Sequence, residues 1–193
     1  ARILGALYFI NNIDDKDLVA RSRRSLIGNS VLFLVFFLSF VIRTLLADGY
    51  AVNPETGEVF MEPYKYLTNF IEMPLVLVLF LIGVVLVLFG IGRSLLKTKF
   101  DKGIWFTGIG TVLAVLALLL VAGYNNTAYY PSTNDLQSSL TLANSCSSQF
   151  TLRVMFYVSF LVPFVLAYIF YAWRSIDIHK ISEKEMKDGG HAY

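Results

Sequence analysis

The stretch PLVLVLFLIGVVLVLFGIG (residues 74–92), followed after a short basic connection by GIWFTGIGTVLAVLALLLVAGY (residues 103–124), decides the fold class. Neither run contains a charged residue. About 20 apolar residues in a helix cross the hydrocarbon core of a bilayer, at a rise of roughly 1.5 Å per residue. Two similar runs flank this pair, and 56% of the chain is hydrophobic. The sequence therefore excludes a soluble enzyme. It predicts an all-α, polytopic membrane bundle with four transmembrane helices, at about 26–46, 73–93, 103–124 and 153–174.

Charged residues outside these runs predict the topology. The segment before the first helix, the second connection and the tail are rich in Lys and Arg: Lys16, Arg21, Arg23, Arg24; Arg93, Lys97, Lys99, Lys102; Arg174, Lys180, Lys184, Lys187. The first connection is acidic apart from Lys65, and residues 124–152 contain no Lys or Arg. Because Lys and Arg are enriched in cytoplasmic loops, we expect the three basic segments, including a tail at 175–193, to face the cytoplasm.

Two shorter segments also carry local signals. Residues 1–10, ARILGALYFI, are apolar but too short to span a membrane before the charged stretch at 14–17, so they indicate the inner end of a helix. The first connection contains NPETG (residues 53–57), in which Pro fixes φ and Gly permits a positive φ. This pattern is typical of a tight turn.

A polar pattern precedes and enters the last predicted helix. Its members are Pro131, Ser138, Ser139, Thr141, Ser148, Gln149, Thr151, Arg153 and Met155, with Pro163 further along the helix. This pattern resembles the signature of subunit II of cytochrome bd quinol oxidases. One departure is Ala143, which stands where many members have a Trp. The resemblance covers most of the chain and implies a single membrane domain over residues 1–193, the second half of an eight-helix subunit.

The resemblance also implies a function and partners. It predicts a haem-free structural subunit of a complex that oxidises quinol and reduces dioxygen to water, with protons taken from the cytoplasm. Haems b and d are expected on the partner, subunit I, and a bound quinone fits this expectation. The expected partners are subunit I, the N-terminal half of the same subunit and the lipid bilayer, with quinol as the substrate of the complex and no nucleic acid. The expected location is the bacterial cytoplasmic (inner) membrane.

The residue inventory agrees with a haem-free chain. The two histidines, His179 and His191, lie in the tail, so no imidazole is available within the spans to hold a haem iron. Met155 could offer a thioether, but Met on an apolar helix is usually packing material. Cys146 is the single cysteine and is read as a free thiol. We therefore predict no catalytic, cofactor-binding or metal-binding residue in this chain.

Glycine pairs in the two central runs have a structural interpretation. Gly90 and Gly92, like Gly108 and Gly110, lack the following residues that a phosphate-binding loop requires. Glycine on a membrane helix instead lets a neighbouring backbone approach closely. We expect these residues to pack helices together.

Two arginines and one proline leave alternatives open. Arg43 and Arg153 stand at the outer ends of helices, where Asp48, Glu62 or Glu72 could meet them. They either anchor subunit I or haem propionates, or snorkel to lipid headgroups. Pro163 removes a backbone donor and frees the carbonyl of Ser159, which predicts a kink. The kink either fits the helix around a neighbour or shapes a passage for protons or dioxygen.

Two other classes of function remain as alternatives. Half of a secondary transporter would need discontinuous helices or a charged site at the midplane, and Pro163 is the hint of one. A membrane adaptor without a respiratory role would need only the four helices.

Overall fold

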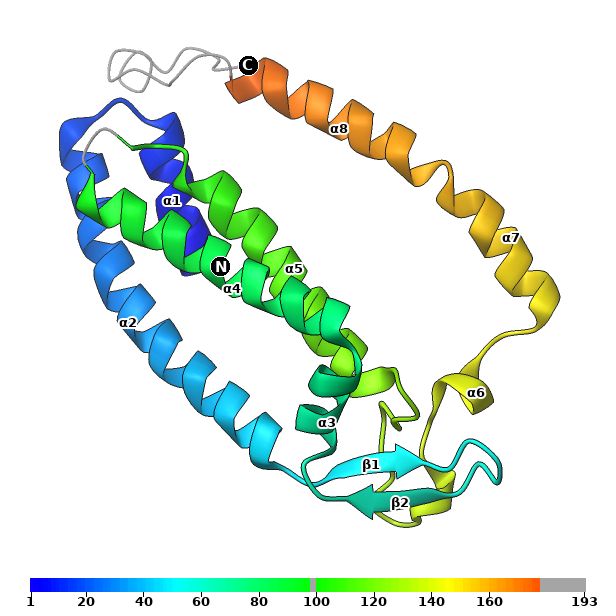
Figure 1. The fold of residues 1–193 in the computed structure, drawn as a ribbon. Helices are drawn as coiled ribbons and strands as arrows, with labels where there is room; N and C mark the ends of the chain where they lie inside the picture. Colours follow the sequence, from blue (N-terminus) through cyan, green and yellow to red (C-terminus); the bar gives the residue numbers. More distant parts are fainter. Residues whose placement is uncertain (98–99, 178–193) are drawn as a thin grey trace.

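The computed structural model describes residues 1–97 and 100–177 (Figure 1). In chain order the elements are α1 (Arg2–Asn12), α2 (Lys16–Leu46), β1 (Gly49–Val52), β2 (Val59–Glu62), α3 (Lys65–Glu72), α4 (Pro74–Leu96), α5 (Gly103–Gly123), the 3-10 turn η1 (Leu136–Ser138), α6 (Leu142–Ser145), α7 (Gln149–Ser159) and α8 (Val162–Asp177). The long helices run between two ends. We call them the hairpin end, which carries β1, β2 and α3, and the α1 end.

Among the described residues, four helical segments are long and apolar enough to cross a membrane: Lys16–Leu46, Pro74–Leu96, Gly103–Gly123 and Gln149–Ser175. This confirms the predicted helical membrane bundle. The first helix begins at Lys16 instead of near residue 26, because the basic residues predicted to precede it belong to the same continuous helix. Its N-terminus is capped by the Asp15 carboxylate, which accepts a hydrogen bond from the Leu18 N–H at 2.8 Å.

Helices α4 and α5 form the tightest pair in the molecule, and glycine permits it. A Cβ placed on Gly110 would lie 2.6 Å from the carbonyl oxygen of Gly83 and 2.8 Å from the backbone nitrogen of Val87. One placed on Gly90 would lie 2.7 Å from the Gly103 carbonyl oxygen. The two backbones are therefore in direct contact, as expected of small residues between membrane helices. Gly92 and Gly108 face open space and take no part in this packing.

The segment predicted to be the inner end of a helix is the helix α1. It packs against α2 and α5 through a small core in which Leu7 of α1 and Leu26 of α2 are fully buried. Ile13, Asp14 and Asp15 then separate α1 from α2. Helix α1 thus lies beside two long helices, with Ala1 and Arg2 exposed at its start.

The hairpin end contains the only strands among the described residues. Strands β1 and β2 pair antiparallel around the predicted turn, in which the Asn53 side chain accepts from the Glu55 N–H at 2.9 Å and Gly57 has φ 73°. The prediction of a turn at 53–57 is thus confirmed. The free edge of β1 binds the chain after α5, since the Val52 N–H donates to the Asn126 carbonyl at 2.8 Å and the Ala128 N–H to the Tyr50 carbonyl at 2.9 Å.

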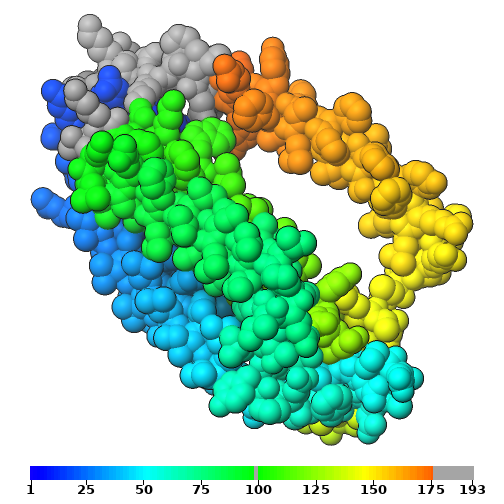
Figure 2. Space-filling model, viewed as in Figure 1, coloured from blue at the N-terminus to red at the C-terminus, as the bar shows by residue number. Residues whose placement is uncertain are grey.

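The fourth span is divided into α7 and α8, which bend at Phe160 and Leu161 (Figure 1). Pro163 lies in the first turn of α8, so the predicted kink is confirmed. The apolar window of this span has none of its residues buried. The space-filling view shows an opening between this span and the other helices (Figure 2). At the α1 end, Trp173 meets Tyr8 edge to face, with ring centroids 6.5 Å apart.

Candidate functional site

The first half of the polar pattern folds the loop at the hairpin end. Ser139 is fully buried, and its hydroxyl accepts from the Ser132 N–H at 3.0 Å. Thr141 and Asn144 form a capping box on the short helix α6, and the Asn144 amide also donates to the Ser139 carbonyl at 2.9 Å. Ser138 donates to the Asp135 carboxylate at 2.9 Å. The hydrogen bonds of these residues shape the loop, and none of them activates a hydroxyl as a nucleophile.

The second half of the pattern lies on α7, away from the first half. Ser148 caps α7 by accepting from the Thr151 N–H at 3.4 Å, and the two hydroxyls lie 3.0 Å apart. Gln149 is the first residue of this helix. Arg153 and Met155 are exposed on it. The structure therefore joins Pro131, Ser138, Ser139 and Thr141 in one loop, places Ser148 to Met155 on an unburied helix, and leaves Pro163 at the bend.

A side-chain amide fixes this loop to the hairpin. Gln137 accepts from the Val59 N–H at 3.0 Å and donates to the Val59 carbonyl at 2.9 Å. The primary amide thus pairs with β2 as a further strand would. The two hydrogen bonds of Gln137 occupy the β2 edge of the hairpin, and the pairing with residues 126–128 occupies the β1 edge.

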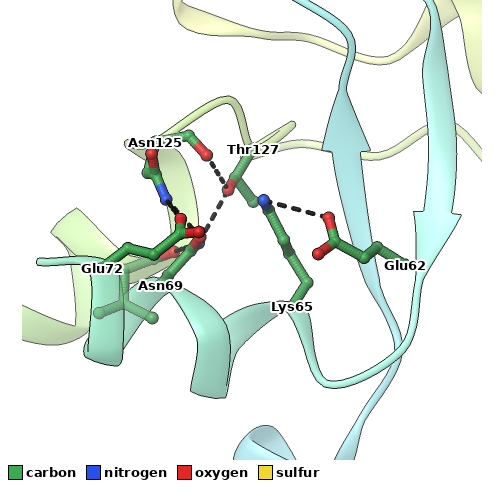
Figure 3. Close-up of polar contacts among 7 residues, drawn as sticks. Glu62, Lys65, Asn69, Glu72, Asn125 and Thr127 are labelled. Carbon is green, nitrogen blue, oxygen red and sulfur yellow. Dashed lines mark hydrogen bonds and ion pairs between the residues drawn. The ribbon is translucent and has the colours of Figure 1, made fainter.

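A buried polar network joins α3 to the end of α5 (Figure 3). Asn69 is fully buried, and its amide donates to the Val121 carbonyl at 2.9 Å and to the Thr127 hydroxyl at 2.8 Å. Its carbonyl oxygen accepts from the Asn125 amide at 3.1 Å, and that same amide also donates to the Glu72 carboxylate. Asn125 and Asn126 both have positive φ, a conformation that Asn tolerates better than most residues.

Lys65 and Tyr66 pack beneath the hairpin. The Lys65 ammonium is 3.2 Å from the Glu62 carboxylate, and Lys65 is 7% exposed. Gly49 lies against this pair, because a Cβ there would come within 2.5 Å of the Lys65 Cβ. Burial raises the pKa of the Tyr66 hydroxyl, and the neighbouring Tyr50 raises this pKa further. Tyr66 therefore stays protonated and neutral in its packed position.

Two of the three acidic partners expected for Arg43 and Arg153 are engaged elsewhere. Glu62 pairs with Lys65, and Glu72 accepts from Asn125. Both arginines are exposed, and neither forms an ion pair with any residue in the ranges 1–97 and 100–177. The expectation that these carboxylates meet the two arginines is wrong for this chain, since local partners satisfy the two glutamates first.

The family described as "Cytochrome bd terminal oxidase subunit II" matches residues 1–176. The chain belongs to this family. Subunit 2 of the cytochrome bd-I ubiquinol oxidase of Escherichia coli K12 is 32% identical over 136 residues, which is 69% of this chain and 34% of that protein. The corresponding subunits of Escherichia coli O6:H1 and O157:H7 match equally. The chain thus spans 34% of the length of these relatives.

Membership of the subunit II family confirms the resemblance read from the polar pattern. It favours a respiratory quinol oxidase subunit over the transporter and adaptor alternatives.

Met155, the one thioether considered for haem, is 63% exposed on α7. Within the part of the chain that the structure describes, no group of three or more His, Cys, Asp or Glu side chains could hold a metal ion. His179 and His191 lie outside the described residues.

Two features escaped prediction from the sequence. Asn69 and Asn125 stand far apart in the chain. The one sequence signal for a turn near them is the Asn125–Asn126 pair after an apolar run, since Asn favours turns and tolerates positive φ. The position of Arg2 could not be predicted, because the short apolar segment around it does not indicate where it packs. In the structure it lines a hollow between the spanning helices, together with residues of α2, α4 and α5.

Proposed function

We propose that this chain is the haem-free structural part of a cytochrome bd-type quinol oxidase. In this proposal the complex oxidises quinol, reduces dioxygen to water and takes protons from the cytoplasm, while haems b and d reside on subunit I. The observation that carries the proposal is the family match over residues 1–176. The lack of imidazole within the predicted spans supports it, since a haem in a helical bundle needs an axial ligand such as His or Met.

The contribution of this chain would be a fixed surface for its partner. The hairpin, α3 and the loop 124–148 are joined by hydrogen bonds from Asn69, Gln137 and Asn144. From this base α7 projects with Arg153 and Met155 exposed. A base with satisfied hydrogen bonds holds its exposed side chains at fixed positions, which favours docking of a second subunit. We assign the polar pattern to this docking role.

The proposal also includes the orientation of the chain in the inner membrane. The basic residues gather at the α1 end and in the tail, so this end would face the cytoplasm and the hairpin end the opposite side of the inner membrane. The tail from residue 178 onward lies outside the described residues. The large apolar surface of the four spans would contact lipid, subunit I, the N-terminal half of the subunit, or a bound quinone.

Purification from native membranes tests this proposal. A tag on this chain should recover a haem-containing subunit, a reduced-minus-oxidised spectrum of b-type and d-type haem, and quinol oxidase activity. The proposal fails if the chain purified alone carries a Soret band. It also fails if the intact oxidase assembles and turns over without this chain.

A further inference from the structure

A groove lies between α8 and α5 at the α1 end, where α8 ends and α5 begins (Figure 1). It has a volume of about 430 Å³, and its lining includes Leu166, Ile169 and Phe170 of α8, Ile104 of α5 and Tyr8 of α1. Ile169 and Phe170 follow Leu166 by three and four positions, so the three side chains lie on one face of α8. None of the residues that line this groove is charged. We call it the α8 groove.

Two tryptophans place the mouth of the α8 groove at the membrane surface. Trp105 lies in the first turn of α5 and Trp173 near the end of α8, and both line the groove. They are 47% and 53% exposed. Tryptophan is enriched where the hydrocarbon of a bilayer meets its headgroups. The groove therefore starts at headgroup level and reaches into the hydrocarbon beside Leu166, which lies roughly 10 Å deeper along α8 at 1.5 Å per residue.

Two exposed cations flank these tryptophans. Lys102 directly precedes α5, and its carbonyl accepts from the Trp105 N–H at 3.3 Å. Arg174 directly follows Trp173 and stands four residues after Phe170, so it lies close to the face of α8 that lines the groove. The mouth of the groove is therefore positively charged, whereas its body is apolar.

The shape of the groove favours hydrocarbon chains over a further helix. The rings of Trp173 and Tyr8 meet edge to face at this end, with centroids 6.5 Å apart. This contact closes the space between α1 and α8, so a helix about 10 Å across cannot continue between them to the membrane surface. A lipid needs no such passage, because its headgroup stays at the surface and its acyl chains enter the groove from the bilayer.

The two cations favour an anionic lipid. Neither Lys102 nor Arg174 forms an ion pair with any residue in the ranges 1–97 and 100–177, and the adjacent Asp101 is half-buried while both cations are exposed. Lys and Arg form short, charge-assisted hydrogen bonds to phosphate oxygens, and basic residues beside a span attract anionic lipids. A zwitterionic lipid or a quinone carries no net negative charge to neutralise these side chains.

We propose that the α8 groove binds an anionic phospholipid of the leaflet at the α1 end, with acyl chains along Leu166, Ile169 and Phe170 and the phosphate held by Lys102 and Arg174. The inference goes beyond the proposed function, since it requires only that the chain spans a membrane. Bound there, the lipid links the fourth span to α5.

Photocrosslinking in lipid nanodiscs tests the occupant. The intact oxidase carries benzoylphenylalanine in place of Phe170, which lines the groove, or of Phe164, which lies on the same helix outside the lining. The nanodiscs contain equal amounts of phosphatidylglycerol and phosphatidylcholine. We expect adducts at position 170 to be enriched severalfold in phosphatidylglycerol, and adducts at position 164 to follow the bulk composition. Equal enrichment at both positions, no enrichment at position 170, or adducts there with a quinone or a polypeptide would overturn the proposal.

Two double variants test the headgroup contact. Lys102→Gln with Arg174→Gln should abolish the enrichment at position 170. Arg21→Gln with Arg24→Gln removes the same charge from exposed arginines of α2 and should leave the enrichment intact. Equal effects of the two double variants, or no effect of the first, would overturn the assignment of the phosphate.

Native mass spectrometry of the oxidase without benzoylphenylalanine gives an independent measurement. One phosphatidylglycerol that survives detergent washing should be lost in Lys102→Gln with Arg174→Gln and kept in Arg21→Gln with Arg24→Gln. An equal lipid count in the two double variants contradicts the proposal. If the haem spectrum and co-purification are normal alongside that result, this inference is wrong and the proposed function stands.

Discussion

Asn69 shows how one side chain can hold an outer loop on a membrane bundle. It bonds to the end of α5, to Thr127 and to Asn125, residues more than fifty positions away in the chain. Because each of these groups is buried or partly buried, water cannot fully replace the hydrogen bonds that Asn69 makes to them. A polar network in a low-dielectric setting is favourable only while all its members are paired. The position of the whole loop therefore depends on this amide.

We expect Asn69→Ala to lower the free energy of unfolding by about 1–3 kcal/mol, because it leaves the Val121 carbonyl and the Thr127 hydroxyl without their donor. Asn134→Ala, at an exposed loop amide, is the control and should change little. Thermal unfolding of the purified oxidase in detergent measures both variants. Equal midpoints for the two variants would mean that the network contributes nothing to stability.

At the scale of elements, the α4–α5 pair depends on close contact between backbones. We expect Gly110→Ala to destabilise the pair by about 1–3 kcal/mol, because its Cβ would meet the backbone of α4 at Gly83 and Val87 and force the helices apart. Gly108→Ala, two residues away on the same helix, adds its Cβ in open space and serves as the matched control. Unfolding in mixed micelles should separate the two variants. A loss at Gly108 as large as that at Gly110 would contradict this account.

Some elements could be predicted from the sequence and others could not. The four apolar helices, the turn at 53–57 and the kink at Pro163 follow from length, turn chemistry and a missing N–H, which are local properties. The strands β1 and β2 are four residues each and depend on pairing with residues 126–128, a contact that no local pattern reveals. For the same reason the polar pattern gave neither the partners of Ser139 nor the role of Asn69.

The whole molecule is an open arrangement of helices instead of a closed bundle. Helices α1, α2, α4 and α5 share small cores, whereas α7 and α8 stand apart and bury none of their apolar window. The space-filling view shows this opening directly (Figure 2). The fourth span is attached at the hairpin end by the loop 124–148 and near the α1 end by the contact of Trp173 with Tyr8. An apolar span with so little contact leaves its surface free to face lipid or other polypeptides.

The contact between Trp173 and Tyr8 should therefore control where α8 lies in the chain purified alone. Spin labels at Val112→Cys on α5 and Val165→Cys on α8, in a Cys146→Ser background, report the separation of the two helices by pulsed electron paramagnetic resonance. We expect Trp173→Ala to broaden the distance distribution, because the edge-to-face pair is lost and the span becomes free to move. Tyr171→Ala, an exposed aromatic on the same helix, should leave the distribution unchanged. An unchanged distribution in Trp173→Ala would show that the loop at the hairpin end alone positions the fourth span.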